Sequence, residues 1–474
     1  MAIVGGGISG LAAAFRLQEL SRERGRPLDL LLLERSSRLG GHVRTEREGE
    51  LLLEAGPDQF VTHKPAAVDL CRRLGLEREL LKLDSGRPTM QVLRDGEPVG
   101  VPEGVTILGP SRMRPLLRSP LFSWRGKARI AAESWAPSRT GVDGDESVGS
   151  FVRRRFGREL LDRVVEPIVG GIFTADVDRL SVEMTLPPYP KLEQKHGSVL
   201  RGLREVREKR KNDRGRARPA FLSVKGGLER LIDRLVSLLP RENIHLHTTV
   251  ESIAHDGDRF GLAIAGRPRL AVDAVILACP AHVSATMVRS WECDLADGLA
   301  SLPYADCATV NLLYPRSAVG RRLAGYGFFA PRVEGLPILA CSYAHAKFPE
   351  RAPGDRVLLR TFLGGALHPE VLGQADEELV ASAHRCLSRV LQIRDEPLSA
   401  RAFRHPRAMP QYPVGYRSRL NSILERAKRY PGLFFSGAVV GAVGLPDCIA
   451  SGERVAAEAL ELARTPSERA ALVS

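Results

Sequence analysis

The sequence has few of the residues from which several common kinds of site are built. Its seven cysteines are scattered and none stands in a CxxC pair, so neither a zinc site nor a disulfide framework is expected. A reducing, cytoplasmic location is favoured instead. No apolar run approaches the ~20 residues of a membrane span, and because the first strand is expected at residue 1 no signal peptide is expected before it. A Ser-His-Asp triad, a metal-ligand cluster and a P-loop lysine are also missing, so the chemistry is expected to belong to a bound cofactor.

Acidic residues are too few to balance the 69 lysines and arginines, which leaves a net charge of +13. One basic stretch, Arg201 to Arg218, lacks interleaved aromatic residues, so no nucleic-acid partner is expected and a solvated loop is predicted. A second stretch, Arg112 to Arg129, mixes arginines with leucines and with Trp124. That mixture suits peripheral contact with an anionic membrane, for example the inner face of the cell membrane, and equally a surface helix with a basic outer face.

The first ten residues, MAIVGGGISG, predict a strand, a glycine turn and a helix. Gly5 allows the tight turn, Gly7 lets the backbone approach a pyrophosphate, and Gly10 allows close packing of helix and strand. Gly6 and Ser9 complete the turn. Free N–H groups at the start of the following helix favour negative charge there. The alternative is an ordinary βαβ unit with a glycine turn.

A second apolar run, Leu28 to Leu33, is typical of a buried parallel strand and ends at Glu34. An acidic residue at this place takes the ribose hydroxyls of a dinucleotide. Arg38 and the pair Gly40-Gly41 offer charge and bare backbone near the phosphates. Together these residues favour a dinucleotide site over an ordinary βαβ unit.

The α/β pattern stops after the first strands and returns about two hundred residues later, at Phe221. A strand, glycine turn and helix close the chain near Gly432 to Ala463. A nicotinamide enzyme normally uses one contiguous domain, whereas three separated segments are the arrangement found in large FAD enzymes. The fold class expected is α/β, with a discontinuous Rossmann-like FAD-binding domain, an antiparallel-sheet substrate domain and a helical insertion.

The length of 474 residues suits two or three domains. The FAD-binding domain is predicted in three parts, the substrate domain in two, and the helical, membrane-associating insertion in one. In chain order they are residues 1–62 (FAD-binding), 63–110 (substrate), 111–218 (insertion), 219–285 (FAD-binding), 286–425 (substrate) and 426–474 (FAD-binding).

The opening glycines with ERSSRLGGHVRT resemble the amine oxidase group of glutathione-reductase-like flavoproteins. Further stretches resemble the oxygen-dependent, FAD-containing porphyrinogen oxidases of haem biosynthesis, namely the protoporphyrinogen and coproporphyrinogen III oxidases. These stretches are EPIVGGIFTADVDRLS, FLSVKGGLERLIDRL, GYGFFAP, FLGGALHPE, AMPQYPVGY and VGLPDCIASG. The likeness runs nearly from end to end, and the later motifs are more specific than the first.

The resemblance implies which residues contact the cofactor and the substrate. The residues implied for FAD are Gly5, Gly6, Gly7, Ser9, Gly10, Glu34, Arg35, Arg38, Gly40 and Gly41 at the adenosine and phosphate end, Gly56, Pro57 and Asp58 near the flavin ring, Val250 at the adenine, and Val443, Gly444 and Leu445 at the pyrimidine edge. The residues implied for the tetrapyrrole are Met90, Gly171, Phe329 and Phe348. The resemblance is also compatible with a homodimer.

The implied reaction is the six-electron dehydrogenation of a porphyrinogen by three hydride transfers to the flavin, with oxygen as acceptor and hydrogen peroxide released. Pyrrole protons leave to water or substrate, so no side-chain base and no metal are expected. Two alternatives remain. One is another flavin amine oxidase or desaturase of this fold, although 5% aromatic residues leave little for the aromatic cage of an amine oxidase. The other is a non-catalytic FAD-binding protein that associates with a membrane.

The sequence departs from the family pattern at three places. Met90 stands where many protoporphyrinogen oxidases have an arginine that pairs with a substrate propionate, so the choice between the two porphyrinogens stays open. Ala438 replaces the asparagine of GNxxxGVG, and Tyr416 replaces a histidine that follows PQY. Arg87 or Arg94 is the hypothesised partner of a substrate carboxylate.

Overall fold

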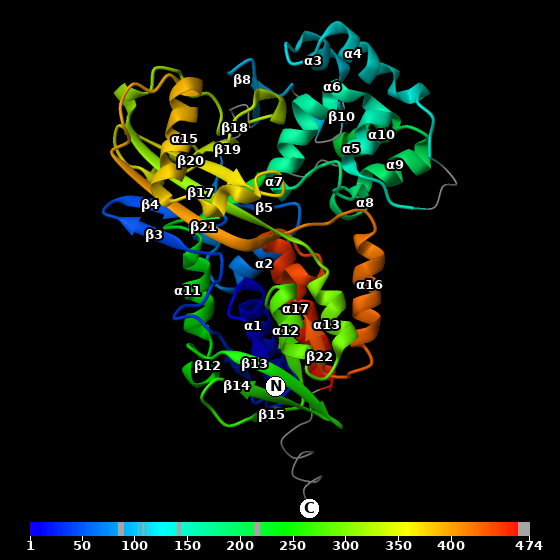
Figure 1. The fold of residues 1–474 in the computed structure, drawn as a ribbon, viewed down its shortest axis with the longest axis vertical. Helices are drawn as coiled ribbons and strands as arrows, with labels where there is room; N and C mark the ends of the chain where they lie inside the picture. The colour runs from blue at the N-terminus through cyan, green and yellow to red at the C-terminus, as the bar shows by residue number, and fades with distance from the viewer. Residues whose placement is uncertain are drawn as a thin grey trace, which may run out of the picture.

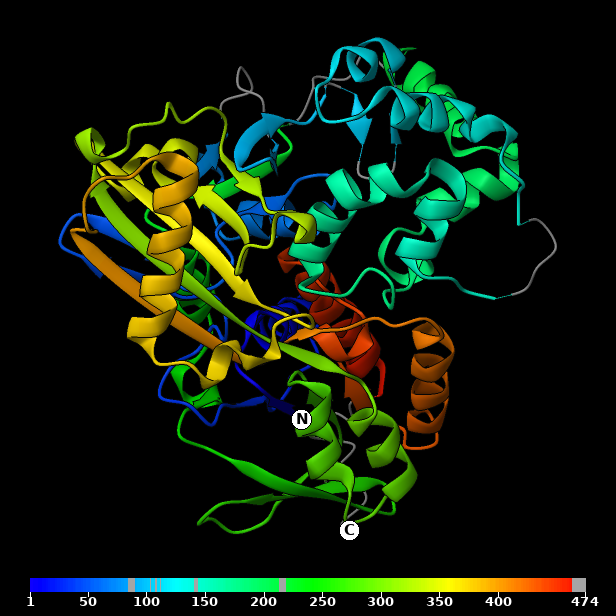
Figure 2. The same ribbon diagram turned by 45° about the horizontal axis from the view of Figure 1, so that its top comes forward.

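The computed structural model describes residues 1–83, 90–102, 104–106, 109–110, 112–139, 144–212 and 219–462 of the chain. It has three parts: a parallel sheet with its helices, an antiparallel sheet, and a group of helices (Figure 1). The antiparallel sheet and the group of helices lie side by side above the parallel-sheet part, and they are also separate in the view with the top turned toward the reader (Figure 2).

Within the described ranges, five strands form the parallel sheet, and they come from three distant segments of the chain. In spatial order they are β12 (Ile244–His245), β2 (Leu31–Leu33), β1 (Ala2–Val4), β16 (Val275–Leu277) and β22 (Leu433–Phe435). Apolar residues fill these short strands because both faces of the sheet are covered. The discontinuous α/β fold expected from the sequence is therefore confirmed, although β2 starts three residues later than the apolar run that predicted it.

Two helices from opposite ends of the chain pack against this sheet and each other. They are α1 (Ile8–Glu23) and α17 (Leu445–Leu462). A Cβ on Gly452 of α17 would lie 2.3 Å from the carbonyl oxygen of Ser9, so only glycine allows the helices to approach this closely. A third helix, α11 (Glu229–Leu238), contributes Leu231, Ile232 and Leu235 to the same core.

The antiparallel sheet contains seven strands in the part of the chain that the structure describes. Their order is β21 (Ser399–Pro410), β17 (Tyr304–Pro315), β20 (Arg356–Gly364), β19 (Ile338–Tyr343), β18 (Gly327–Phe329), β7 (Gln91–Arg94) and β8 (Glu97–Gly100). All neighbours are antiparallel except β18 and β7, which are parallel. Helix α15 (Asp376–Leu391) covers one apolar face, while on the other face Thr309 Oγ1 donates to Ala55 O of the first segment (3.1 Å).

The group of helices is built mainly from residues 113–212. Its elements are α3 (Met113–Arg118), α4 (Trp124–Ala131), η2 (Ala132–Trp135), α5 (Val148–Phe156), α6 (Arg158–Leu160), the π-helix η3 (Leu161–Gly170), α7 (Gly171–Phe173), α8 (Val182–Thr185), α9 (Pro188–His196) and α10 (Val199–Asn212). The prediction of a loop at Arg201 to Arg218 is wrong up to residue 212, because Leu200 and Leu203 bury one side of α10. Residues 213–218 lie outside the described residues.

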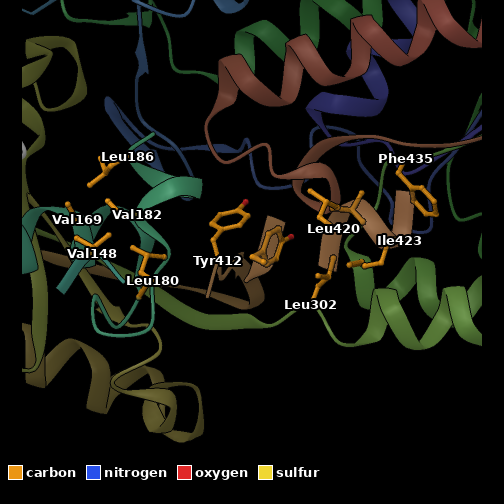
Figure 3. Packing of buried hydrophobic residues seen from close by; sticks show 14 of the residues in the cluster. Val148, Val169, Leu180, Val182, Leu186, Leu302, Tyr412, Leu420, Ile423 and Phe435 are labelled. Carbon is orange, nitrogen blue, oxygen red and sulfur yellow. The ribbon is translucent and has the colours of Figure 1, made fainter. Parts of the chain in front are cut away.

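One hydrophobic core joins the helices to the parallel-sheet part. In Figure 3, Tyr412 stands between Leu180 and Val182 of the helical group and Leu420 of α16 (Tyr416–Ala427). The rings of Tyr412 and Tyr416 meet edge to face at 4.8 Å, a favourable arrangement for two buried aromatic rings. Among the described helices, none has the length and apolar character that crossing a bilayer requires.

Candidate functional site

The opening glycine turn has the geometry that a dinucleotide needs. Gly5 has a φ of 110°, and a Cβ on Gly10 would lie 2.0 Å from Gly5 O, so the fold itself requires glycine at both positions. Gly7 differs, because its φ of −71° is ordinary and no described atom lies within 4 Å of where its Cβ would be. The fold therefore does not require glycine at position 7, whereas a pyrophosphate in that open space would.

Ser9 is 6% exposed and lies where α1 meets the C-terminal segment. A Cβ on Gly437 would come within 2.7 Å of Ser9 Oγ. The structure thus brings the N-terminal and C-terminal segments together at the beginning of α1. The sequence predicts a strand, a glycine turn and a helix in each of these two segments, as parts of one FAD-binding domain.

Glu34, which follows β2, is held against the glycine turn. Its Oε2 accepts a hydrogen bond from Gly6 N (2.7 Å), and its Oε1 accepts bonds from Ser36 N (2.8 Å) and Ser36 Oγ (2.7 Å). Backbone and hydroxyl donors thus fix the carboxylate at the mouth of the turn, where a ribose would arrive. Arg35 beside it is exposed.

Arg38 braces the loop that covers the glycine turn. Its guanidinium donates to Gly41 O (2.8 Å) and Val43 O (2.6 Å) and pairs with Glu229 (3.1 Å). Gly40 N in turn donates to Gly6 O (2.8 Å). In this structure Arg38 thus fixes the loop beside the glycine turn, because its guanidinium already contacts three protein groups.

The segment 55–58 closes the same region from the side of the antiparallel sheet. A Cβ on Gly56 would collide with His42 O at 1.8 Å. Pro57 follows, and Asp58 is 8% exposed and accepts from Lys347 Nζ (3.1 Å) and an Arg351 guanidinium nitrogen (3.3 Å). Burial favours a raised pKa for Asp58, but these cations together with Arg360 hold it well below its ordinary value.

The remaining residues implied for FAD lie on separate elements. Val250 begins β13 (Val250–Asp256) and is 5% exposed. Val443 and Gly444 precede α17, and Leu445 is its first residue. The start of α17 is tied down by Asp447, which pairs with Lys64 Nζ at 2.6 Å.

Of the four residues implied for the tetrapyrrole, the structure brings two into contact. A Cβ on Gly171 would lie 3.0 Å from Cδ1 of Phe329, so the end of the π-helix presses on β18. Met90 is half-buried just before β7, and its carbonyl accepts from Val101 N (3.0 Å). Phe348 is 2% exposed and lies under the Arg351 guanidinium, 4.4 Å from its ring centroid.

Of the two arginines hypothesised to pair with a substrate carboxylate, only Arg94 is among the described residues. Arg94 stands at the end of β7 and pairs with Asp95 (3.3 Å), in the turn that joins β7 to β8. Arg87 lies outside the described residues.

Sequence reasoning missed a cluster of buried charged side chains around Asp58. Its members are Glu54, Lys347, Arg351 and Arg360, and Arg360 donates to the carbonyls of Ala55 (3.2 Å) and Gly56. Burial raises the pKa of Glu54, although Arg351 opposes the shift. Arg360 could have predicted the cluster, because it is a charged residue within the apolar run Val357 to Phe362. A charged side chain in a buried strand needs a charged or hydrogen-bonding partner.

A cavity of about 530 Å³ lies beside the π-helix, but it contains none of the four residues implied for the substrate. Its lining is Arg153, Arg158, Leu161, Asp162, Glu166, Asp176, Val177, Asp178, Arg332, Val333 and Leu367. Arg153 pairs with Asp178 and Arg158 with Asp162 (3.0 Å). With four carboxylates against three arginines, the cavity suits an anionic ligand poorly.

Comparisons with known proteins agree with this geometry. Residues 8–460 match the family model described as "Flavin containing amine oxidoreductase". The chain is 32% identical to a coproporphyrinogen III oxidase of Bacillus subtilis over 97% of both chains. It is 30% identical to a chloroplastic protoporphyrinogen oxidase of rice, over 94% of this chain and 85% of the other.

A solved structure shows the same likeness in three dimensions. An Exiguobacterium protein with the provisional name protoporphyrinogen oxidase superposes with a TM-score of 0.84 at 29% identity, covering 97% of this chain and 98% of its own. The resemblance drawn from the sequence motifs is therefore confirmed. The glycine turn, the fixed Glu34 carboxylate and the open space at Gly7 suit the flavin cofactor of this family. The chain belongs to the flavin-containing amine oxidoreductases and is an oxidoreductase whose cofactor is FAD.

Proposed function

We propose that this protein is an oxygen-dependent porphyrinogen oxidase of haem biosynthesis, with coproporphyrinogen III as its substrate and protoporphyrinogen IX as the alternative. The bacterial relative that carries the first name matches over nearly the whole of both chains. The structural observation that carries the proposal is the contact between Gly171 and Phe329, which places the helical group against the sheet face that turns toward residues 55–58.

That sheet face offers an apolar row on which a flat macrocycle can lie. Phe329 on β18 pairs with Ala340 on β19, and Ala340 pairs with Phe362 on β20. Paired residues on neighbouring strands share a face, so two half-buried rings flank one small side chain. Offset stacking of a tetrapyrrole on such rings is favourable, and Gly171 leaves room at the edge of the row.

We also propose which residues contact each part of FAD. FAD would lie with its pyrophosphate at Gly5, Gly7 and Gly10 and its ribose at Glu34, with Val250 near the adenine, 56–58 near the flavin ring and 443–445 at the pyrimidine edge. The positive end of α17 would then face the ring, and a helix N-terminus favours negative charge. Supporting this arrangement, Ser9 and Gly437 bring α1 and the C-terminal turn together.

Bound FAD supplies the hydride acceptor, and three two-electron steps convert the porphyrinogen to the porphyrin with three oxygen molecules reduced to hydrogen peroxide. The chain's own residues orient the macrocycle and exclude water from one of its faces. The nearby histidines are poor proton acceptors: burial, with His42 adding to it, lowers the pKa of His405 to about 4. Pyrrole protons would therefore leave to water, without a side-chain base.

The test is oxygen uptake by the FAD-loaded protein with each porphyrinogen. Three oxygen molecules consumed and three peroxides formed per fluorescent porphyrin would support the proposal, and the ratio of kcat/KM for the two substrates would identify the preferred one. The control is the same protein stripped of flavin. Absence of turnover on both porphyrinogens by FAD-loaded protein would contradict the proposal.

The helical group also supports a proposal of peripheral membrane contact. Three large apolar side chains of the helical group are exposed: Leu117 on α3 (42%), Trp124 on α4 (75%) and Trp135 on η2 (84%). Helices α3 and α4 form the outer tip of the group, at the top of Figure 1, and η2 follows α4 directly in the chain. Arg114 and Arg118 on α3 and Arg125 on α4 are exposed as well. Tryptophan with surrounding arginine is the combination that partitions into an anionic lipid interface.

A further inference from the structure

The charges buried around the segment 55–58 do not balance. Lys347, Arg351 and Arg360 supply three cations, whereas Glu54 and Asp58 supply two carboxylates. Four of these five residues are at most 8% exposed, and the Lys347 side chain is 11% exposed. Within the described residues, one positive charge is therefore left over in this cluster, and an unpaired buried charge is strongly unfavourable.

Arg360 is the cation of this cluster that has no carboxylate in direct contact. Asp58 accepts from Lys347 and Arg351, and Glu54 lies 3.5 Å from Arg351. Among the described residues Arg360 has no carboxylate within salt-bridge distance, and its Nε has no hydrogen-bond partner. Its other contacts are neutral: two backbone carbonyls, and the ring of Phe362 at 4.8 Å.

The groups beside Arg360 in the sheet are neutral. Its neighbours in register are Asn311 on β17 and Ser342 on β19, and both are neutral and buried. Burial raises the pKa of Cys307 to about 11, and burial likewise lowers the pKa values of His42 and His405. At neutral pH these groups carry no charge. Asp58 and Glu54 favour the charged guanidinium only from beyond salt-bridge distance, because Lys347 and Arg351 make the direct contacts with these carboxylates.

The position of Arg360 relates this charge to the cofactor. Its guanidinium donates to Ala55 O and Gly56 O, so it holds the segment that the proposed function places beside the flavin ring. We infer that Arg360 is a positioning residue that raises the reduction potential of the flavin, because its uncompensated buried charge stabilises the negative charge that a flavin ring acquires when it is reduced. This inference rests on the proposed placement of FAD.

A substrate carboxylate is the other group that could supply the missing counter-charge. Burial argues against a substrate carboxylate as this partner. Arg360 is 3% exposed, and its neighbours in register, Asn311 and Ser342, are 2% and 5% exposed. A hydrated carboxylate needs direct access to its partner. A charge that acts on the flavin through a low-dielectric interior needs no such access.

The experiment measures the two-electron midpoint potential of the bound flavin by dye-coupled titration of the FAD-loaded protein. Arg360→Gln keeps a donor and removes the charge, so the ratio of reduced to oxidised flavin at a fixed potential should fall about tenfold, which is about 30 mV. Arg360→Lys keeps the charge and should stay near the wild-type value. Asp58→Asn removes a carboxylate and should move the potential upward.

The matched control is Arg356→Gln. Arg356 lies on the same strand and the same face, but it is partly exposed and pairs with Glu50 (2.9 Å), so its loss should leave the potential unchanged. If Arg360→Gln fails to fold or to retain FAD, the other two variants decide: the potential should rise in Asp58→Asn and stay near the wild-type value in Arg360→Lys.

Two outcomes would overturn the inference: an unchanged potential in FAD-loaded Arg360→Gln, or a potential in Asp58→Asn that does not rise. The unchanged potential in Arg360→Gln could also come with a raised KM for porphyrinogen. That combination would assign the charge to a substrate carboxylate. Failure of the proposed function is a separate result, because wild-type protein that oxidises neither porphyrinogen still yields a potential for each variant.

Discussion

The ring of Phe329 lies so close to Gly171 that a methyl group on Gly171 would be 3.0 Å from Phe329 Cδ1. This contact joins the end of the π-helix to the antiparallel sheet, and it brings together two residues that the sequence motifs implicate in substrate binding. π-helical segments are frequent at functional sites. The edge of the proposed slot is therefore set by the absence of a side chain at position 171.

Gly171→Ala should raise the KM for porphyrinogen several-fold and leave the FAD content unchanged, because the added methyl displaces the Phe329 ring from the apolar row. Phe329→Leu should itself raise the KM, and adding Gly171→Ala to it should raise the KM little further, because the smaller side chain leaves room for the methyl. Steady-state kinetics on the three proteins measures this. Gly373→Ala, where the new methyl meets no described atom, is the control, and an unaltered KM in Gly171→Ala would remove Gly171 from the substrate site.

Gly7→Ala should weaken FAD binding at least tenfold without lowering the stability of the flavin-free protein. The reason is that its backbone is ordinary and its new methyl meets only the space assigned to the pyrophosphate. Gly10→Ala should instead destabilise the flavin-free protein, because its methyl would collide with Gly5 O. Thermal unfolding and flavin-fluorescence titration separate the two effects, and full FAD affinity in Gly7→Ala would contradict the assignment.

Arg155→Ala should lower the free energy of unfolding by about 3–5 kcal/mol. The side chains of Arg155 and Glu133 are fully buried, and Arg155 also donates to Ala136 O (3.0 Å) and Gly197 O (3.1 Å). Removing the guanidinium leaves a buried carboxylate unpaired. Arg158→Ala is the comparison: that side chain is 84% exposed in its pair with Asp162, so less than about 1 kcal/mol should be lost. Urea denaturation measures both, and equal losses would refute the argument.

The double variant Trp124→Ser with Trp135→Ser should bind vesicles containing anionic lipid about tenfold less tightly than the wild type, with oxidation of porphyrinogen in solution unchanged. Both rings are mostly exposed, so their loss removes interfacial contacts without opening the core. Vesicle co-sedimentation with and without anionic lipid measures binding. Leu398→Ser changes an exposed apolar residue away from the tip and should have no effect; equal binding by the double variant would refute membrane docking through this tip.

Glu166→Gln should stabilise the protein at pH 8 and leave it unchanged at pH 4. Burial raises the pKa of Glu166 from its ordinary 4.5 to about 6, although Arg332 N donates to it (3.0 Å). The folded protein therefore binds this proton more tightly than the unfolded chain does, and stability falls as the pH rises from about 4.5 to about 6. The penalty above pH 6, about 1–2 kcal/mol, disappears in the glutamine variant. Denaturation curves at both pH values test this, and a gain confined to pH 4 would reverse the assigned sign.

Local patterns in the sequence were enough to predict the parallel-sheet part. Gly5 and Gly10 predict their turn because each is required by backbone geometry within a few residues of itself. The Arg201–Arg218 stretch was misjudged up to residue 212, since its charges suggested a loop while Leu200 and Leu203 pack one side of a helix.

The sequence by itself thus determined the glycine turn, the discontinuous α/β fold and the flavin cofactor, because strand, turn and helix patterns depend on near neighbours along the chain. Only the tertiary structure decided that Gly171 meets Phe329, and that Arg360 reaches Ala55 and Gly56 while Lys347 and Arg351 take the nearby carboxylates. These contacts join residues far apart in the sequence. Their energies depend on burial and on which charges share one interior, and neither is encoded in a local pattern.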